Sequence, residues 1–145
     1  EPTAESSTID NKATVAIAPI ETGHGWVWPA DGVVSSRFED NTGDNGIDIS
    51  GQSGAPIQAA APGKVVYAGT GLRGYGLLLI IKHDETYLSA YAHNRAVMAK
   101  EGDEVGKGQV IAEMGQTGAE SPRLHFEIRK DGKPVDPLRY LPQKN

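Results

Sequence analysis

The sequence predicts a mainly β domain built as an antiparallel sheet or sandwich, and three observations support this class. Short runs rich in Val, Ile and Tyr recur at intervals of about 8–12 residues, a spacing typical of all-β sandwiches and barrels. The chain has 18 glycines and 9 prolines, many of them at turns between these runs. No stretch shows the apolar period of an amphipathic helix.

The elements follow in order from the N-terminus. Residues 1–24 are rich in Ser, Thr and Ala without a sustained period, so we expect a flexible linker there and a folded domain over residues 25–145. The domain begins at the aromatic stretch WVW. Strands are expected at GVVSSRF, GIDIS, APIQAAAPG, KVVYAG, LLLIIKH, TYLSAYAH, QVIAEMG and LHFEIRK. A short helix is expected at residues 137–141.

Two of these strands carry the most information. The run at residues 77–81 is apolar on both faces, which predicts a central strand. In the stretch SPRLHFEIRK, strand alternation sends three apolar side chains to one face and four polar ones to the other. The apolar set is Leu124, Phe126 and Ile128, and the polar set is Arg123, His125, Glu127 and Arg129.

Length and composition exclude several classes of protein. A chain of 145 residues fits one domain, and a net charge of −5 argues against a general nucleic-acid binder. No run is long and apolar enough to span a membrane. The absence of cysteine excludes disulfides and thiolate metal sites. Since the chain does not begin with Met, we expect it to be a piece of a longer protein.

Four residues could form a site, namely Asp44, Asp48, His93 and His125. Carboxylate and imidazole groups bind zinc when three of them converge and one coordination position stays open. From the residues alone, however, His125 could be a metal ligand, a catalytic base or, as is most common for a lone His, a solvated side chain on a polar strand face.

The order of motifs resembles a known family. The stretches GID, VYAG, YG, IKH, YAH, GKGQVIAEMGQTG and LHFE occur in the order found in the LytM/lysostaphin-type zinc endopeptidases of bacterial cell walls. The resemblance covers about residues 26–141. It implies the antiparallel β fold of that family, also described as duplicated hybrid motif-like.

The resemblance also implies site residues. The family's HxxxD motif supplies a His and an Asp to zinc, and the second His of its HxH motif completes the ligands. Asp48 matches the Asp ligand, His125 matches the ligand His, and His93 matches a catalytic His. Two positions differ, because Asp44 and Arg123 stand where the family has histidines.

These two replacements predict a metal-free, non-catalytic site. Arg123 stays protonated and cannot serve as a base. At ~6 Å from a divalent cation and an effective dielectric of ~20, its charge costs roughly 5 kcal/mol of repulsion. We therefore expect no cofactor, with Asp48, His93 and His125 as relics of the site. We also expect an ion pair between Asp44 and Arg123.

Within the family, the chain most resembles the NlpD-type lipoproteins, through LRGYG, YLSAYAHN, RLHFEIR and PLRYLP. That resemblance implies an activator of periplasmic N-acetylmuramoyl-L-alanine amidases in peptidoglycan remodelling and daughter-cell separation at cell division. The zinc-less groove would bind a regulatory helix of the murein amidase. The location implied is the periplasm, anchored to the outer membrane by a lipid that this chain lacks.

The residues expected to contact such a partner line one groove. Arginines supply charge for acidic residues of a helix, and a tyrosine supplies an aromatic anchor. Glu127 is expected only to pair with an arginine, His83 to be structural, and His24 to have no function. The expected groove residues are Asp44, Asn45, Tyr75, Leu78, Arg123, His125 and Arg129.

Two other functions stay open at this point. The first is an active zinc endopeptidase that uses Asp44, Asp48 and His125 as ligands. The second is a peptidoglycan-binding module that leaves the amidase rate unchanged. The residue at position 123 separates the activator from the peptidase, whereas only the family resemblance favours the activator over the binding module.

Overall fold

The computed structural model describes residues 23–38 and 45–143, and within them the backbone is almost entirely antiparallel β-sheet. The predicted fold class is therefore confirmed. The predicted linker at 1–24 falls almost wholly outside the described residues, so its boundary stays a prediction. No helix among the described residues has the length and apolar character needed to cross a membrane.

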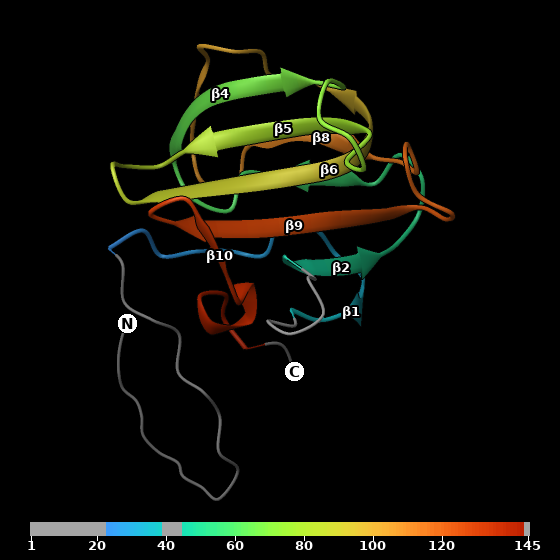
Figure 1. Ribbon diagram of the computed structural model, residues 1–145, viewed down its shortest axis with the longest axis horizontal. Helices are drawn as coiled ribbons and strands as arrows, with labels where there is room; N and C mark the ends of the chain where they lie inside the picture. Colours follow the sequence, from blue (N-terminus) through green and yellow to red (C-terminus); the bar gives the residue numbers. More distant parts are fainter. Residues whose placement is uncertain (1–22, 39–44, 144–145) are drawn as a thin grey trace, which may run out of the picture.

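The strands form one connected sheet whose main row is β1-β2-β9-β6-β5-β4-β7, with β10 on β9 and a β3–β8 pair joined through β6. In Figure 1 the long strands β4, β5, β6 and β9 run side by side. The strands are β1 (Val33–Ser36), β2 (Ile47–Ser50), β3 (Pro56–Gln58), β4 (Gly63–Gly69), β5 (Leu77–Lys82), β6 (Tyr87–Val97), β7 (Glu104–Val105), β8 (Val110–Met114), β9 (Arg123–Lys130) and β10 (Lys133–Val135).

The C-terminal turn is a short 3₁₀-helix at Pro137–Arg139. The side chain of Asp136 accepts a hydrogen bond from the Leu138 amide, which caps the start of the helix, and Pro137 supplies a fixed φ at its first turn. The short helix expected over residues 137–141 is therefore present, although it ends earlier.

The core lies on one face of the main row. It joins β2, β5, β6 and β9 to the β3–β8 pair, and its largest fully buried side chains are Tyr91, Phe126, Ile47, Ile49, Ile57, Leu79, Ile81, Ile111, Met114, Leu124 and Ile128. The expected burial of Leu124, Phe126 and Ile128 is confirmed. The central position of the run at 77–81 is also confirmed, because β5 pairs with β4 and β6.

The opposite face of the row carries a smaller apolar cluster. Leu78, Ala90 and Ala92 are buried there, and Tyr67, Tyr75 and Ile80 pack against them. Alternation places the polar side chains of β9 on this second face, next to the small side chains of β6. This face holds the candidate site.

Candidate functional site

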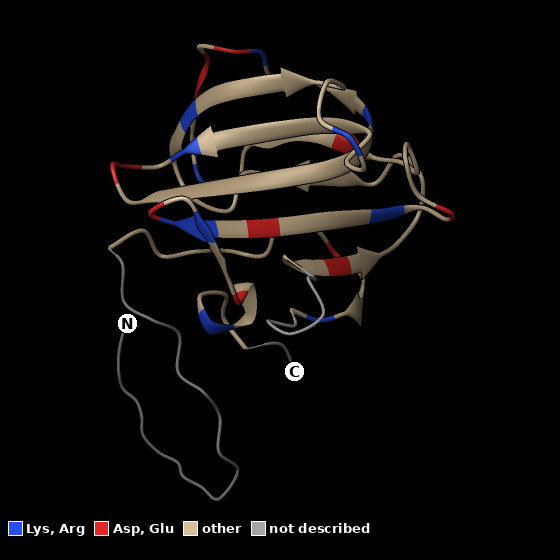
Figure 2. Cartoon of the chain, in the orientation of Figure 1, with Lys and Arg blue, Asp and Glu red and all other residues tan. Residues whose placement is uncertain are grey.

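The strand register brings the predicted residues together. In β9, His125 pairs with Asp48 of β2 on one side and with Ala92 of β6 on the other, while Glu127 pairs with Ala90. Residues directly opposite in neighbouring strands share a face, so the small side chains of Ala90 and Ala92 lie beside Glu127 and His125. Figure 2 shows the acidic residue of β9 between basic residues, beside the acidic residue of β2.

His125 is held between two carboxylates. Its Nδ1 atom lies 2.7 Å from Oδ1 of Asp48, and its Nε2 atom lies 2.8 Å from Oε2 of Glu127. A carboxylate oxygen only accepts hydrogen bonds, so both ring nitrogens donate and the ring is an imidazolium. Burial opposes this charge, but the hydrogen bonds to Asp48 and Glu127 outweigh it and raise the pKa of His125 to about 9.

Glu127 is the centre of this network. Its side chain is 1% exposed, Oε1 accepts a hydrogen bond from Nε of Arg129 at 2.8 Å, and Nη2 of Arg129 forms an ion pair with the same oxygen at 2.7 Å. Its other oxygen accepts from the Tyr75 hydroxyl at 2.9 Å. Burial raises the pKa of Glu127, but the hydrogen bonds from His125 and Arg129 hold it below its usual value. The expectation that Glu127 only pairs with an arginine was therefore wrong.

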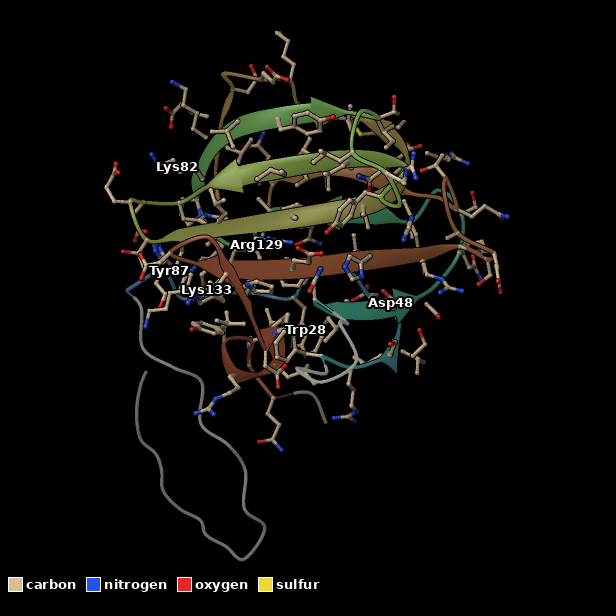
Figure 3. All side chains as sticks on the ribbon, viewed as in Figure 1. Trp28, Asp48, Lys82, Tyr87, Arg129 and Lys133 are labelled. Atoms are coloured by element: carbon tan, nitrogen blue, oxygen red, sulfur yellow. The ribbon has the colours of Figure 1, made fainter. Side chains whose placement is uncertain are left out.

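Arg123, Asp48, His125, Glu127 and Arg129 form a row of charged side chains, and Arg123 lies at the end opposite to Arg129. Its Nη1 atom is 3.5 Å from Oδ2 of Asp48, and Nη2 donates to Oγ of Ser121 at 2.9 Å. Burial alone would raise the pKa of Asp48, but His125 and Arg123 hold it below its usual value. Asp44 lies outside the described residues, so the predicted ion pair with Arg123 stays a prediction. Figure 3 labels two members of this network, Asp48 on β2 and Arg129 on β9.

His93 does not end its strand as expected, because β6 continues to Val97. His93 lies within the strand, where the pairing register against β5 shifts, and its φ of 69° is a left-handed conformation that is rare outside glycine. Its Nδ1 atom donates to the Thr117 carbonyl at 2.7 Å. Burial outweighs this hydrogen bond and lowers the pKa of His93, so the ring stays neutral with Nε2 as an acceptor.

The glycine-rich loop after β4 covers part of this face. The Tyr75 carbonyl accepts a hydrogen bond from the His93 amide at 2.9 Å, and the Tyr75 hydroxyl donates to Glu127. At Gly76, with φ of +62°, a Cβ atom would lie 2.2 Å from the Thr117 carbonyl oxygen. The loop can therefore approach residue 117 only because position 76 has no side chain.

Two hollows lie side by side on this face, and Tyr75 and Glu127 belong to the wall of both. The polar hollow measures about 280 Å³, and its lining includes Asn45, Asp48, Arg73, His93 and His125. The apolar hollow measures about 290 Å³ and is lined mainly by Leu72, Leu78, Ile80, Leu88 and Ala90.

Sequence reasoning found part of this surface. Of the seven residues predicted to line the groove, five line one of the two hollows, namely Asn45, Tyr75, Leu78, His125 and Arg129. Arg123 lines neither hollow, and Asp44 lies outside the described residues. Sequence reasoning missed Arg73, Leu88 and the central place of Glu127. For Glu127 a signal existed, because positions i and i+2 of a strand share a face, so it had to lie beside His125.

The described residues do not by themselves complete the zinc site that the LytM resemblance implies. A catalytic zinc site uses three protein ligands and an open position. Here the two matching donors, Asp48 and His125, hydrogen-bond directly to each other, and Arg123 adds a fixed positive charge beside them. Over residues 23–38 and 45–143, no group of three or more His, Asp or Glu side chains is arranged to hold a metal ion.

The fold and this site define a class, an antiparallel β domain of the zinc-peptidase type with a histidine–carboxylate row on its open face. The sequence profile of Peptidase family M23 matches residues 42–137. The chain belongs to this family. Its fold also resembles a zinc-containing peptidase from Vibrio cholerae, with a TM-score of 0.69 and 32% identity, covering 79% of this chain and 40% of the other.

Two curated relatives are more similar in sequence. The chain is 59% identical over 133 residues to "Lipoprotein NlpD/LppB homolog" of Pseudomonas aeruginosa PAO1, covering 91% of this chain and 44% of the relative. It is 58% identical over 127 residues to "Murein hydrolase activator NlpD" of Escherichia coli K12, covering 87% of this chain and 33% of the relative. The chain thus spans less than half the length of either relative.

Proposed function

We propose that this domain is a non-catalytic activator of a periplasmic N-acetylmuramoyl-L-alanine amidase, acting in peptidoglycan remodelling and daughter-cell separation. The observation that carries the proposal is the direct hydrogen bond between Asp48 and His125 with Arg123 beside it. At positions that match zinc ligands, this chain has a self-contained row of ion pairs. The similarity to a protein named as a murein hydrolase activator supports the same function.

The part of the molecule that acts in this proposal is the groove formed by the two hollows. The groove lies on the open face of the sheet, and its side chains are held in place by hydrogen bonds from β2, β9 and the loop that carries Tyr75. A pre-organised surface loses little conformational entropy when it binds a partner. We propose that it binds a regulatory helix of the amidase and so releases the amidase active site.

The same proposal includes a location. The relative from Pseudomonas aeruginosa is named a lipoprotein, and the present chain spans 44% of it. We propose that the whole protein is anchored by lipid to the outer membrane and acts on the periplasmic side, without a metal cofactor and without nucleic acid as a partner.

The experiment that tests this function is dye release from labelled peptidoglycan by the domain alone, by a purified periplasmic amidase alone and by the two together. We expect release above the amidase baseline only in the mixture. Arg123→Ala is expected to weaken this activation if Arg123 faces an acidic residue of the helix. Release by the domain alone that a chelator abolishes would identify a zinc endopeptidase instead. Binding to peptidoglycan without any change in amidase rate would identify a binding module.

A further inference from the structure

Around the groove the hydrogen-bond acceptors of the carboxylates are used within the protein, whereas some hydrogen-bond donors of the arginines are not. The oxygens of Glu127 already accept from His125, Tyr75 and Arg129, and those of Asp48 accept from His125 and Arg123. The carboxylates are therefore occupied within the protein. An arginine has five N–H donors, so the guanidinium groups keep donors that the network does not use.

Arg73 stands out among these cations. It lines the polar hollow, it is exposed, and no hydrogen bond or ion pair joins it to any residue that the structure describes. The described residues that line the two hollows include two arginines, Arg73 and Arg129, and two carboxylates, Asp48 and Glu127. Both carboxylates are ion-paired within the protein, Asp48 with His125 and Glu127 with Arg129, so Arg73 is the lining arginine without a counter-ion among the described residues. Its charge is complementary to an anionic group of a partner.

The neighbouring hollow has the opposite character. Leu72, Leu78, Ile80 and Leu88 give it aliphatic walls, and at about 290 Å³ it has room for a large apolar side chain. Leu72 is 45% exposed at its rim. Filling such a hollow removes apolar surface of both molecules from water, which makes it a strong point of attachment for a protein partner.

The two hollows share Tyr75 and Glu127 in their walls. A ligand that occupies both hollows must therefore carry its anionic group and its apolar group close together, separated by no more than this shared wall. A peptide segment meets this requirement readily, because neighbouring side chains on one face of a helix lie ≈ 5–6 Å apart.

We propose that the groove binds a two-part feature of its protein partner, a carboxylate beside Arg73 and a large apolar side chain in the hollow of Leu72, Leu78, Ile80 and Leu88. This inference rests on the proposed function and specifies the partner chemistry at the same groove. It makes Arg73 and Leu88 determinants of partner specificity, although neither belongs to the row of ion pairs.

The test measures the dissociation constant of the whole chain for the purified amidase at low and high NaCl, together with dye release. Leu72→Gln and Leu88→Gln are expected to raise the dissociation constant about tenfold at every salt concentration, since they alter only the apolar contact. Arg73→Gln is expected to weaken binding mainly at low salt and to flatten the salt dependence. Met98→Gln is the matched control, because Met98 is 53% exposed and lines neither hollow.

The outcomes separate this inference from the function on which it rests. Each variant must first keep the thermal unfolding midpoint of the unmodified chain. One outcome would overturn the two-part binding proposal and leave the proposed function standing. In it the unmodified chain activates the amidase normally, and the three variants Leu72→Gln, Leu88→Gln and Arg73→Gln bind the amidase as tightly as Met98→Gln does. If the variants lose binding to insoluble peptidoglycan but keep amidase binding, the occupant is the cell wall and the proposal is overturned. Failure of the unmodified chain to bind or activate the amidase would overturn the proposed function and this inference with it.

Discussion

Nε2 of His125 lies 2.8 Å from Oε2 of Glu127, two residues further along the same strand. The other ring nitrogen faces Asp48, and Glu127 is itself held by Arg129 and Tyr75. The row is thus one connected unit, largely shielded from water. In such a unit, removal of one charge leaves its partner buried without a counter-charge. The resulting loss of folding free energy is far larger than the net stabilisation that the intact pair provides.

Glu127→Gln is therefore expected to lower the free energy of unfolding by about 3 kcal/mol. The amide has no charge to offset His125 and Arg129, and its NH₂ group would face other donors. Urea denaturation at pH 7 measures the change. The matched control is Glu113→Gln, which breaks a more exposed ion pair of 2.8 Å with Arg95 and should cost less than about 1 kcal/mol. Equal losses in the two variants would contradict this account.

A second chain of hydrogen bonds pairs every donor with an acceptor when His83 is neutral. The Ala60 amide donates to the Tyr91 hydroxyl at 2.9 Å, which donates to Ser89 at 2.7 Å. The Ser89 hydroxyl then donates to Nε2 of His83 at 2.8 Å, and Nδ1 donates to the Pro62 carbonyl at 2.7 Å. If Nε2 carried a proton it would donate to the Ser89 oxygen, and one hydroxyl proton of the Ser89–Tyr91 pair would lose its acceptor.

Stability is accordingly expected to fall in mild acid. Burial outweighs the hydrogen bond to Pro62 and lowers the pKa of His83 from 6.5 to about 4. Between these values the unfolded chain binds more protons than the folded one, so the free energy of unfolding decreases as the pH falls from 6.5 to 4. The contribution of His83 is about 3 kcal/mol at 1.36 kcal/mol per pKa unit.

Denaturation curves at several pH values, compared with those of His83→Gln, isolate this contribution. The unmodified chain should lose more stability than the variant between pH 6.5 and 4, because the variant has no ring to protonate. His24 and Asp84 lie close to His83 and remain in both proteins, so the two proteins differ only at position 83. Parallel pH profiles would show that His83 accepts a proton without cost.

Gly76 is expected to be intolerant of substitution. In Gly76→Ala the new methyl carbon would meet the Thr117 carbonyl oxygen at 2.2 Å, in addition to the strain of φ +62°. Gly74→Ala is the matched control, since φ there is +90° but nothing lies within 4 Å of the added carbon. The free energy of unfolding should fall by about 2 kcal/mol more in Gly76→Ala. A similar loss in both would mean that the loop moves away from residue 117 at little cost.

The combined change Asp44→His and Arg123→His is expected to create zinc binding. It removes the fixed charge beside Asp48 and His125 and adds an imidazole at position 44, which gives three ligands with one open position. Elemental analysis after dialysis should find about one zinc ion per chain. Arg123→Gln, which removes the charge without adding a ligand, should stay metal-free. A folded but metal-free double variant would show that the groove differs in shape as well as in its residues.

The sequence predicted the fold class, most strands and the two faces of β9 because alternation is a local property of the chain. Leu124, Phe126 and Ile128 are buried as the pattern requires. The two-residue strand β7 and the three-residue strand β10 escaped prediction, because segments so short carry no period. The continuation of β6 beyond His93 was missed for a different reason, since the left-handed conformation of His93 and its hydrogen bonds to Tyr75 and Thr117 leave no local pattern in the sequence.

The sequence by itself determined which side chains share a strand face, and so placed Arg123, His125, Glu127 and Arg129 together. Only the tertiary structure decided what lies beside them. The register of β2 against β9 places Asp48 beside His125, although the two are 77 residues apart in the sequence. The loop that carries Tyr75 places its hydroxyl against Glu127, which is 52 residues away in the sequence. Such pairings depend on the packing of the whole core, since a shift of one residue in register would turn every side chain of β2 to the opposite face.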